Sequence, residues 1–178
     1  MALNATIYKA ELHISDLDRH YYHNHHLTLA LHPSETLERL MVRLLVFIIH
    51  ANENLEFCKG LSTDDEPDLW QRNLVGEIEQ WYELGQLDEK RVRKACHQSK
   101  EVWIYTYQPK SATVWWQHIH NKIQRFNNLN VIHLADETSK SLTELSNRNM
   151  KLQCTIEDGE IWLSDSENTV HIKPTQWK

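Results

Sequence analysis

The chain contains few of the residues that interrupt regular structure. Its 178 residues include only four glycines and four prolines. No Gly/Ser-rich linker, repeat or low-complexity stretch divides it, so short turns and long elements are expected. A chain of this length suits one hydrophobic core, and we therefore expect a single domain over residues 1–178.

Cysteine is also scarce. Cys58, Cys96 and Cys154 are odd in number and widely spaced, and no C-x-x-C pair occurs. A disulfide framework needs paired cysteines and a zinc ribbon needs closely spaced ones, so both are disfavoured. We expect free thiols that are mostly buried.

Long apolar runs are missing as well. No run approaches the roughly 18 consecutive apolar residues that a membrane-spanning helix requires. The first residues, "MALNATIYKAELHIS", lack a basic region followed by an apolar stretch, so they do not resemble a secretory signal. We expect a cytoplasmic protein with no membrane partner.

Positive charge is in short supply. The chain has 19 Lys and Arg against 25 Asp and Glu, a formal net charge of -6. Such a charge repels phosphate backbones at long range, so nucleic-acid binding would need a local basic patch or bound cations. The charge therefore counts against a nuclease.

Alternating apolar residues are present near both ends of the chain. In "ATIYKAELHI" the side chains of Tyr8, Ala10, Leu12 and Ile14 share one face, and Leu27, Leu29 and Leu31 share one face after the turn at "SDLDR". This alternation predicts a long N-terminal β-hairpin with one buried face. The stretch "LQCTIEDGEIWL" predicts a second hairpin that turns at Asp158-Gly159.

Helical periodicity fills much of the sequence between the hairpins. This periodicity predicts helices at residues 32–52, 87–98, 111–126 and 137–148. Short apolar runs between them predict strands at residues 101–107 and 128–134. Ser34 is the expected N-cap of the first helix, where Glu35 can pair with Arg39, and Asp88 is the expected N-cap of the second. This order predicts an α/β fold: a mixed α+β sheet with helices on its faces and antiparallel additions at its ends.

A strand rich in carboxylates follows the first helix. In "EIEQWYELG", Glu77, Glu79 and Glu83 share one strand face, where they repel one another unless water, a base or a metal lies between them. A chain reversal could bring the earlier Asp68 beside Glu83 as a second oxygen ligand for a hard cation such as magnesium. A plain solvated face is the other interpretation.

A run of histidines in "HISDLDRHYYHNHHLTLALH" suggests a zinc site at first sight. Strand alternation places His23 and His25 on the side of the leucines and His20 and His26 on the other. No tetrahedral set forms from the strand alone, and no H-E-x-x-H helix follows. We interpret these residues as sheet-surface histidines, either pH-sensitive or in a protein-contact face.

Several long blocks resemble one known family. "DRHYYHNHHLTLALHPSETLERLMVRLL", "LEFCKGLSTDDEPDLW", "GEIEQWYELGQLDEKRVRKAC" and "LQCTIEDGEIWL" together resemble the YaeQ family of small bacterial proteins over essentially the whole chain. The resemblance implies a restriction-endonuclease-like core of the PD-(D/E)XK type. In that fold a mixed sheet is flanked by helices and an acidic strand carries the metal site. The family has no settled biochemical activity.

Within this resemblance, Pro67-Asp68 is similar to the PD element and the tripeptide from Glu83 to Gly85 to the (D/E)XK element. Asp68 and Glu83 are then the implied magnesium ligands. Gly85 stands where the lysine should be, although that lysine is expected to activate the attacking water.

Other residues could complete such a site. Some members of the superfamily take the missing cation from a neighbouring helix, and "DEKRVRKAC" offers Lys90 and Lys94. The helix before the sheet often adds an acid, for which Glu38 is the candidate. The predicted catalytic set is therefore Glu38, Asp68, Glu83 and either Lys94 or Lys90.

Two classes of function follow. The first is a non-catalytic or weakly active nuclease-fold protein that binds nucleic acid or a protein partner, with gene expression as one setting. The second is a magnesium-dependent phosphodiesterase or nuclease acting on DNA or RNA. Gly85 and the charge of -6 favour the first class. The acids kept on one strand face favour the second, so whether the protein is an enzyme stays open.

Overall fold

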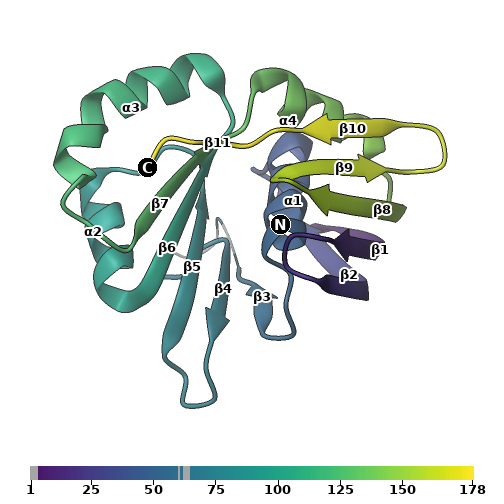
Figure 1. The fold of residues 1–178 in the computed structure, drawn as a ribbon, viewed down its shortest axis with the longest axis horizontal. Helices are drawn as coiled ribbons and strands as arrows, with labels where there is room; N and C mark the ends of the chain where they lie inside the picture. Colours follow the sequence, from purple (N-terminus) through teal and green to yellow (C-terminus); the bar gives the residue numbers. More distant parts are fainter. Residues whose placement is uncertain (1–3, 60, 62–64) are drawn as a thin grey trace. The chain divides into compact units, whose positions relative to one another are not determined.

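The computed structural model describes residues 4–59, 61 and 65–178. The chain folds into two compact units, each with its own sheet and each described here by itself (Figure 1). Unit 1 comprises Met1–Ile49 and Glu137–Pro174, and unit 2 comprises His50–Asp136 and Thr175–Lys178. The expectation of a single domain stays a prediction.

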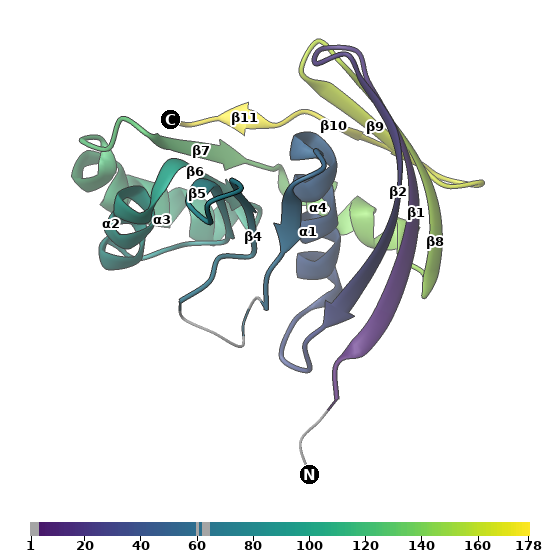
Figure 2. The ribbon, with the colours of Figure 1, turned by 90° about the horizontal axis from the view of Figure 1, so that it is seen from below.

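Unit 1 is built on a five-stranded mixed sheet of order β10-β9-β8-β1-β2. The strands are β1 (Thr6–Asp16), β2 (Tyr21–Leu31), β8 (Asn149–Glu157), β9 (Glu160–Ser164) and β10 (Thr169–Ile172). β1 is antiparallel to β2 and parallel to β8. Helix α1 (Leu37–His50) lies along the concave side of this curved sheet (Figure 2).

The N-terminal hairpin is confirmed. β1 and β2 pair without interruption from Thr6–Leu31 to Asp16–Tyr21, and Ala10, Leu12 and Ile14 are buried. The predicted N-cap of the following helix is wrong. Ser34 contacts the His32 ring at 2.6 Å, whereas Thr36 Oγ1 accepts from the Arg39 amide at 3.2 Å. The hydroxyl of Ser34 is thus engaged before the helix begins, and α1 starts after Thr36.

The hairpin between β8 and β9 is confirmed too. Asp158 and Gly159 have φ of 52° and 73°, as a two-residue type I′ turn requires. Asp18, in the turn between β1 and β2, accepts from the amides of Asp158 and Gly159 at 2.8 and 2.9 Å. These two hairpin turns of unit 1 are therefore held together. Helix α4 (Asp136–Leu142) and a 3-10 turn (Thr143–Leu145) lead into β8.

Unit 2 is built on a six-stranded sheet of order β11-β7-β6-β5-β4-β3. The strands are β3 (Leu55–Phe57), β4 (Leu69–Arg72), β5 (Ile78–Leu84), β6 (Ser99–Thr106), β7 (Leu129–His133) and β11 (Thr175–Gln176). β5, β6 and β7 are parallel, and helices α2 (Glu89–Gln98) and α3 (Pro109–Ile123) connect them. β3, β4 and β11 add antiparallel pairs at the two sides.

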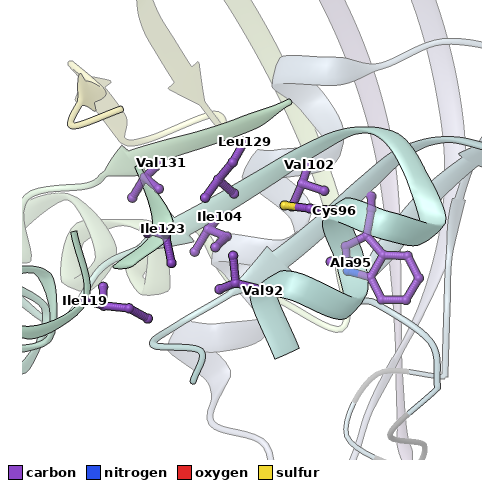
Figure 3. Close-up of a cluster of buried hydrophobic side chains, with 10 residues drawn as sticks. Val92, Ala95, Cys96, Val102, Ile104, Ile119, Ile123, Leu129 and Val131 are labelled. Carbon is purple, nitrogen blue, oxygen red and sulfur yellow. The ribbon is translucent and has the colours of Figure 1, made fainter. Parts of the chain in front are cut away.

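The core of unit 2 lies between this sheet and helices α2 and α3 (Figure 3). Val92 and Ile123 from the helices are fully buried, as are Ile104 and Val131 from the strands. Asp88 caps α2 as predicted, because its carboxylate accepts from the Arg91 amide at 2.7 Å. Leu87 packs against the same core.

The mixed α/β class is confirmed, but the strands form two sheets across the described part of the chain instead of one. The split arises because β8 returns from far along the chain to pair with β1, a contact that no local pattern encodes. Among the described residues, no helix is long and apolar enough to cross a membrane.

The three cysteines are free, and Cys96 and Cys154 are buried, as expected. Burial raises the pKa of Cys96 to about 11 and, with Asp16 nearby, that of Cys154 to about 12. Burial also raises the pKa of Cys58, where Glu66 and Asp68 add to the effect. All three are therefore protonated and unreactive at neutral pH.

Candidate functional site

The predicted acid pair comes together in unit 2. Asp68 lies just before β4 and Glu83 lies on β5, and the antiparallel pairing of these strands places Leu69 opposite Tyr82. The Asp68 amide donates to the Tyr82 carbonyl at 3.0 Å, and Asp68 Oδ2 accepts from the Leu84 amide at 2.8 Å. Asp68 and Glu83 are only 2% and 6% exposed. The expected chain reversal is thus confirmed as a hairpin.

Arg91 of α2 provides the cation beside Glu83. Its Nη2 and Nε lie 2.6 and 2.7 Å from Glu83 Oε1. The indole of Trp81 donates to the same oxygen at 2.9 Å. Arg91 also donates to the Glu66 carbonyl at 2.7 Å. One guanidinium therefore joins helix α2, strand β5 and the segment that enters β4.

The pKa of Glu83 depends more on its burial than on its ion pair with Arg91. Burial and the nearby charge of Asp68 raise the pKa of Glu83 to about 7, while Arg91 and Trp81 act in the opposite direction. An ion pair at 2.6 Å would by itself lower this pKa, so burial outweighs the pair. Glu83 consequently gains or loses its proton near neutral pH.

The other two acids of β5 and its approach do not join this pair. Lys100 lies 3.4 Å from Glu79 and 4.0 Å from Glu77. The β4–β5 register shifts beside Glu79, and the buried ring of Trp81 stands between it and Glu83 along the strand. These acids thus divide into a group beside Lys100, in which Glu77 is exposed and Glu79 half-buried, and a buried group beside Arg91.

The remaining predicted site residues lie on helices α2 and α1. Lys94 forms an ion pair of 2.7 Å with Asp65, and Lys90 is exposed on α2. Glu38 is half-buried in the first turn of α1, in unit 1. The catalytic roles suggested for Glu38, Lys90 and Lys94 stay predictions.

Gly85 adopts a backbone conformation that explains its identity. Its φ is +98°, and its amide donates to the Tyr105 carbonyl at 2.8 Å. Nothing lies within 4 Å of a Cβ built at this position, so space is not the constraint. Residues with a side chain rarely adopt this φ. A lysine at the expected position of the motif would therefore be strained in this backbone.

One oxygen of each acid already accepts hydrogen bonds in this arrangement, which leaves fewer oxygens for a magnesium ion. Magnesium requires near-octahedral oxygen ligands. Here Glu83 Oε1 already accepts from Arg91 and Trp81, and Asp68 Oδ2 accepts from a backbone amide. In residues 4–59, 61 and 65–178, no group of three or more His, Cys, Asp or Glu side chains could hold a metal. The Arg91 guanidinium is the cation that contacts Glu83 in this structure.

Sequence reasoning did not single out Arg91 or Trp81. The available signal was that Arg91 directly precedes Val92, the first buried residue of the α2 apolar stripe, so its stem lies beside the core. Its fork can also bind one carboxylate with two N–H groups, which a lysine cannot do. Trp81 shares a strand face with Glu83 two positions away, so its indole can reach that carboxylate.

The turn between β4 and β5 forms a second candidate site. Leu74 and Val75 are 106% and 80% exposed at its tip. Asn73 fixes the turn, because its side-chain oxygen accepts from the amides of Val75 and Glu77 at 3.1 and 2.9 Å. A hollow of about 510 Å³ on one side includes Glu53, Glu56, Arg72 and Glu79 in its wall. A second hollow of about 600 Å³ includes Asp65, Glu77, His97 and Lys100.

Comparison with known proteins identifies relatives along the whole chain. Residues 1–174 match the family model described as YaeQ protein. The chain is 48% identical over 178 residues to the uncharacterized protein YaeQ of Escherichia coli (strain K12), covering 100% of this chain and 98% of the relative. The match to the uncharacterized protein YaeQ of Salmonella typhi has the same identity and coverage.

Solved structures agree with these matches. The crystal structure of the YaeQ protein from Xanthomonas axonopodis pv. citri has a TM-score of 0.95 at 47% identity, covering 98% of each chain. That of the YaeQ protein from Pseudomonas syringae has a TM-score of 0.93 at 32% identity, covering 98% of this chain and 96% of the other. This chain therefore belongs to the YaeQ family.

Proposed function

We propose that this protein is a non-catalytic binding protein whose acid pair has become a structural clasp. The observation that carries the proposal is that the Arg91 guanidinium lies 2.6 Å from Glu83, where catalysis would require a metal. In this proposal unit 2 is a variant of the restriction-endonuclease-like core. Its three parallel strands, joined by α2 and α3, and the acids at β4 and β5 support that assignment.

The clasp gives the acids a physical role without metal chemistry. Asp68 ties the start of β4 to the end of β5 through the Leu84 amide, and Glu83 ties β5 to α2 through Arg91. Two carboxylates kept close together would otherwise repel each other. Their retention therefore does not require an active hydrolase, and Gly85 leaves no lysine at the motif position beside them.

The exposed turn between β4 and β5 supports a protein partner in preference to a nucleic acid. Leu74 and Val75 offer apolar side chains in solvent on a turn that Asn73 fixes, a feature typical of interaction sites. The surrounding hollows contain more acids than bases: Asp65, Glu53, Glu56, Glu77 and Glu79 against Arg72 and Lys100. This charge repels phosphates and suits a basic protein surface with an apolar pocket.

Divalent metals are expected to leave the melting temperature of this protein almost unchanged. The guanidinium already neutralises Glu83, so millimolar magnesium or manganese gains nothing by binding the native state. Differential scanning calorimetry measures the melting temperature with and without metal. The proteins compared are the wild type, Asp68→Asn and Glu83→Gln. A rise of several degrees in the wild type that both variants lose would instead favour the magnesium-dependent phosphodiesterase.

Binding through the β4–β5 turn can be measured with a library of displayed random peptides. Selection on the immobilised protein is expected to enrich basic peptides that contain apolar residues. Their affinity should fall at least about tenfold for the variant with Leu74→Ser and Val75→Ser. Val114→Ser replaces an exposed aliphatic residue of α3 and should leave affinity unchanged. Failure to enrich peptides, or equal affinity for both variants, would overturn the proposed turn site.

A further inference from the structure

Strand β2 forms one edge of the five-stranded sheet in unit 1, and it lacks the usual features that protect an edge. It is 11 residues long and pairs with β1 without a bulge. Its sequence, "YYHNHHLTLAL", contains no proline and no Asp, Glu, Lys or Arg. Tyr22 is 56% exposed, and Asn24, His26 and Thr28 are exposed as well. A long, uncharged edge of this kind is a template for another strand.

The backbone groups that face outward follow from the hydrogen bonds of β1. The amides of Lys9 and Leu17 donate toward β8, to the carbonyls of Arg148 and Ile156 at 2.8 Å each. Backbone groups of odd-numbered β1 residues therefore face β8, and those of even-numbered ones face β2. Because Leu12 pairs with His25, the odd-numbered residues of β2 bond to β1.

The even-numbered residues of β2 consequently turn their N–H and C=O groups away from the sheet. Two contacts at the end of the strand agree with this direction. Arg43 Nη2 donates to the Ala30 carbonyl at 2.9 Å, and the His32 amide donates to Glu35 at 3.3 Å. The outward backbone groups that remain open to a partner strand thus run from Tyr22 to Thr28. The edge ends at Ala30, because Arg43 already occupies the Ala30 carbonyl. In the described chain no strand adjoins this edge.

We propose that a second copy of this chain pairs with this edge, antiparallel, about a two-fold axis at His25. This inference goes beyond the binding function proposed above. The segment between Tyr22 and Thr28 is centred on His25, so each copy supplies the outward groups that the other needs. Tyr22 then lies opposite Thr28 of the partner copy, and Asn24 lies opposite His26 of the partner copy.

The charge of β2 favours a second copy as the occupant. Two identical strands carry identical charges, so a strand rich in Lys or Glu would repel itself, whereas β2 has no such residue. The pairing would form about eight interchain hydrogen bonds, two for each of the four outward pairs. Symmetric self-pairing through one surface is the commonest route to a closed dimer.

Sedimentation equilibrium of the full chain over a range of concentrations tests the assembly. The wild type is expected to form dimers, and Thr28→Lys should weaken the dimer at least about tenfold by placing charge on the paired edge. The matched control is Thr169→Lys on β10, the opposite edge of the same sheet, which should leave dimerisation unchanged. A monomeric wild type, or a dimer that Thr28→Lys does not weaken, overturns the proposal.

Disulfide trapping tests the register. His25 would lie opposite its own copy in a non-hydrogen-bonded pair, where Cα atoms are about 4.5 Å apart and a disulfide can form. Mild oxidation of His25→Cys should give a covalent dimer on non-reducing gels. Position 23 lies on the same strand face but opposite Leu27 of the partner copy. His23→Cys should therefore give little covalent dimer. Equal trapping of both variants, or of neither, would overturn the two-fold pairing at His25.

Discussion

Replacement of Arg91 by methionine is expected to lower the free energy of unfolding by about 3 kcal/mol at about pH 8. The substitution leaves the buried Glu83 carboxylate without its cation and the Glu66 carbonyl without a donor, while methionine keeps most of the apolar stem. Without Arg91 the buried Glu83 must either stay ionised and desolvated or take up a proton, and both lower the stability of the folded state at this pH. Urea unfolding followed by circular dichroism measures the change.

Two further variants show whether the loss belongs to the clasp. Lys94→Met removes a cation from the same helix whose partner, Asp65, is largely exposed, so it should change stability little. Combining Arg91→Met with Glu83→Gln should cost less than Arg91→Met alone, since no buried carboxyl is then left to be desolvated or protonated. A loss no larger than that of Lys94→Met would contradict the structural clasp and leave Arg91 as an ordinary surface cation.

The second large effect is a change in the pH dependence of stability caused by Glu83→Gln. The native pKa of Glu83 is about 7 and its ordinary value is 4.5, so the folded state holds this proton more tightly than the unfolded state. The resulting stabilisation is complete below pH 4.5 and is lost as the pH rises to about 7. The stability of the wild type relative to Glu83→Gln should therefore fall by about 3 kcal/mol across this range.

The measurement is a series of urea unfolding curves at closely spaced pH values for both proteins. Glu79→Gln is the matched control, because it removes a carboxylate from the same strand at a partly exposed position beside Lys100. Its pH dependence should follow that of the wild type through this range. Parallel curves for the wild type and Glu83→Gln would show that Glu83 titrates normally and would contradict the burial argument.

Local patterns in the sequence determined most elements of the fold. Strand alternation was sufficient for the N-terminal hairpin because more buried residues alternate with exposed ones along most of β1. The Asp158-Gly159 turn was predictable because few residue pairs tolerate positive φ at both positions. Asp88 was predictable as a helix N-cap because its carboxylate accepts a hydrogen bond from an amide only three residues away. Each of these signals is short in range.

The Asp68–Glu83 pair was only partly determined by the sequence. The number of residues between the two acids allowed a reversal that would bring them together, and the β4–β5 hairpin does so. The resemblance to the PD-(D/E)XK motif also implied that Gly85 stands at the position of the expected lysine. The backbone reason for that glycine, a φ of +98°, appears only in the folded chain.

Tertiary structure alone decided what the acids contact and which strands share a sheet. Lys90, Arg91 and Lys94 are similar cations in the sequence, yet only Arg91 has the position on α2 and the geometry to hold Glu83 and the Glu66 carbonyl together. The parallel pairing of β1 with β8 likewise joins residues that are far apart along the chain. Such contacts depend on how whole elements pack, because burial and distance between remote segments have no local pattern in the chain.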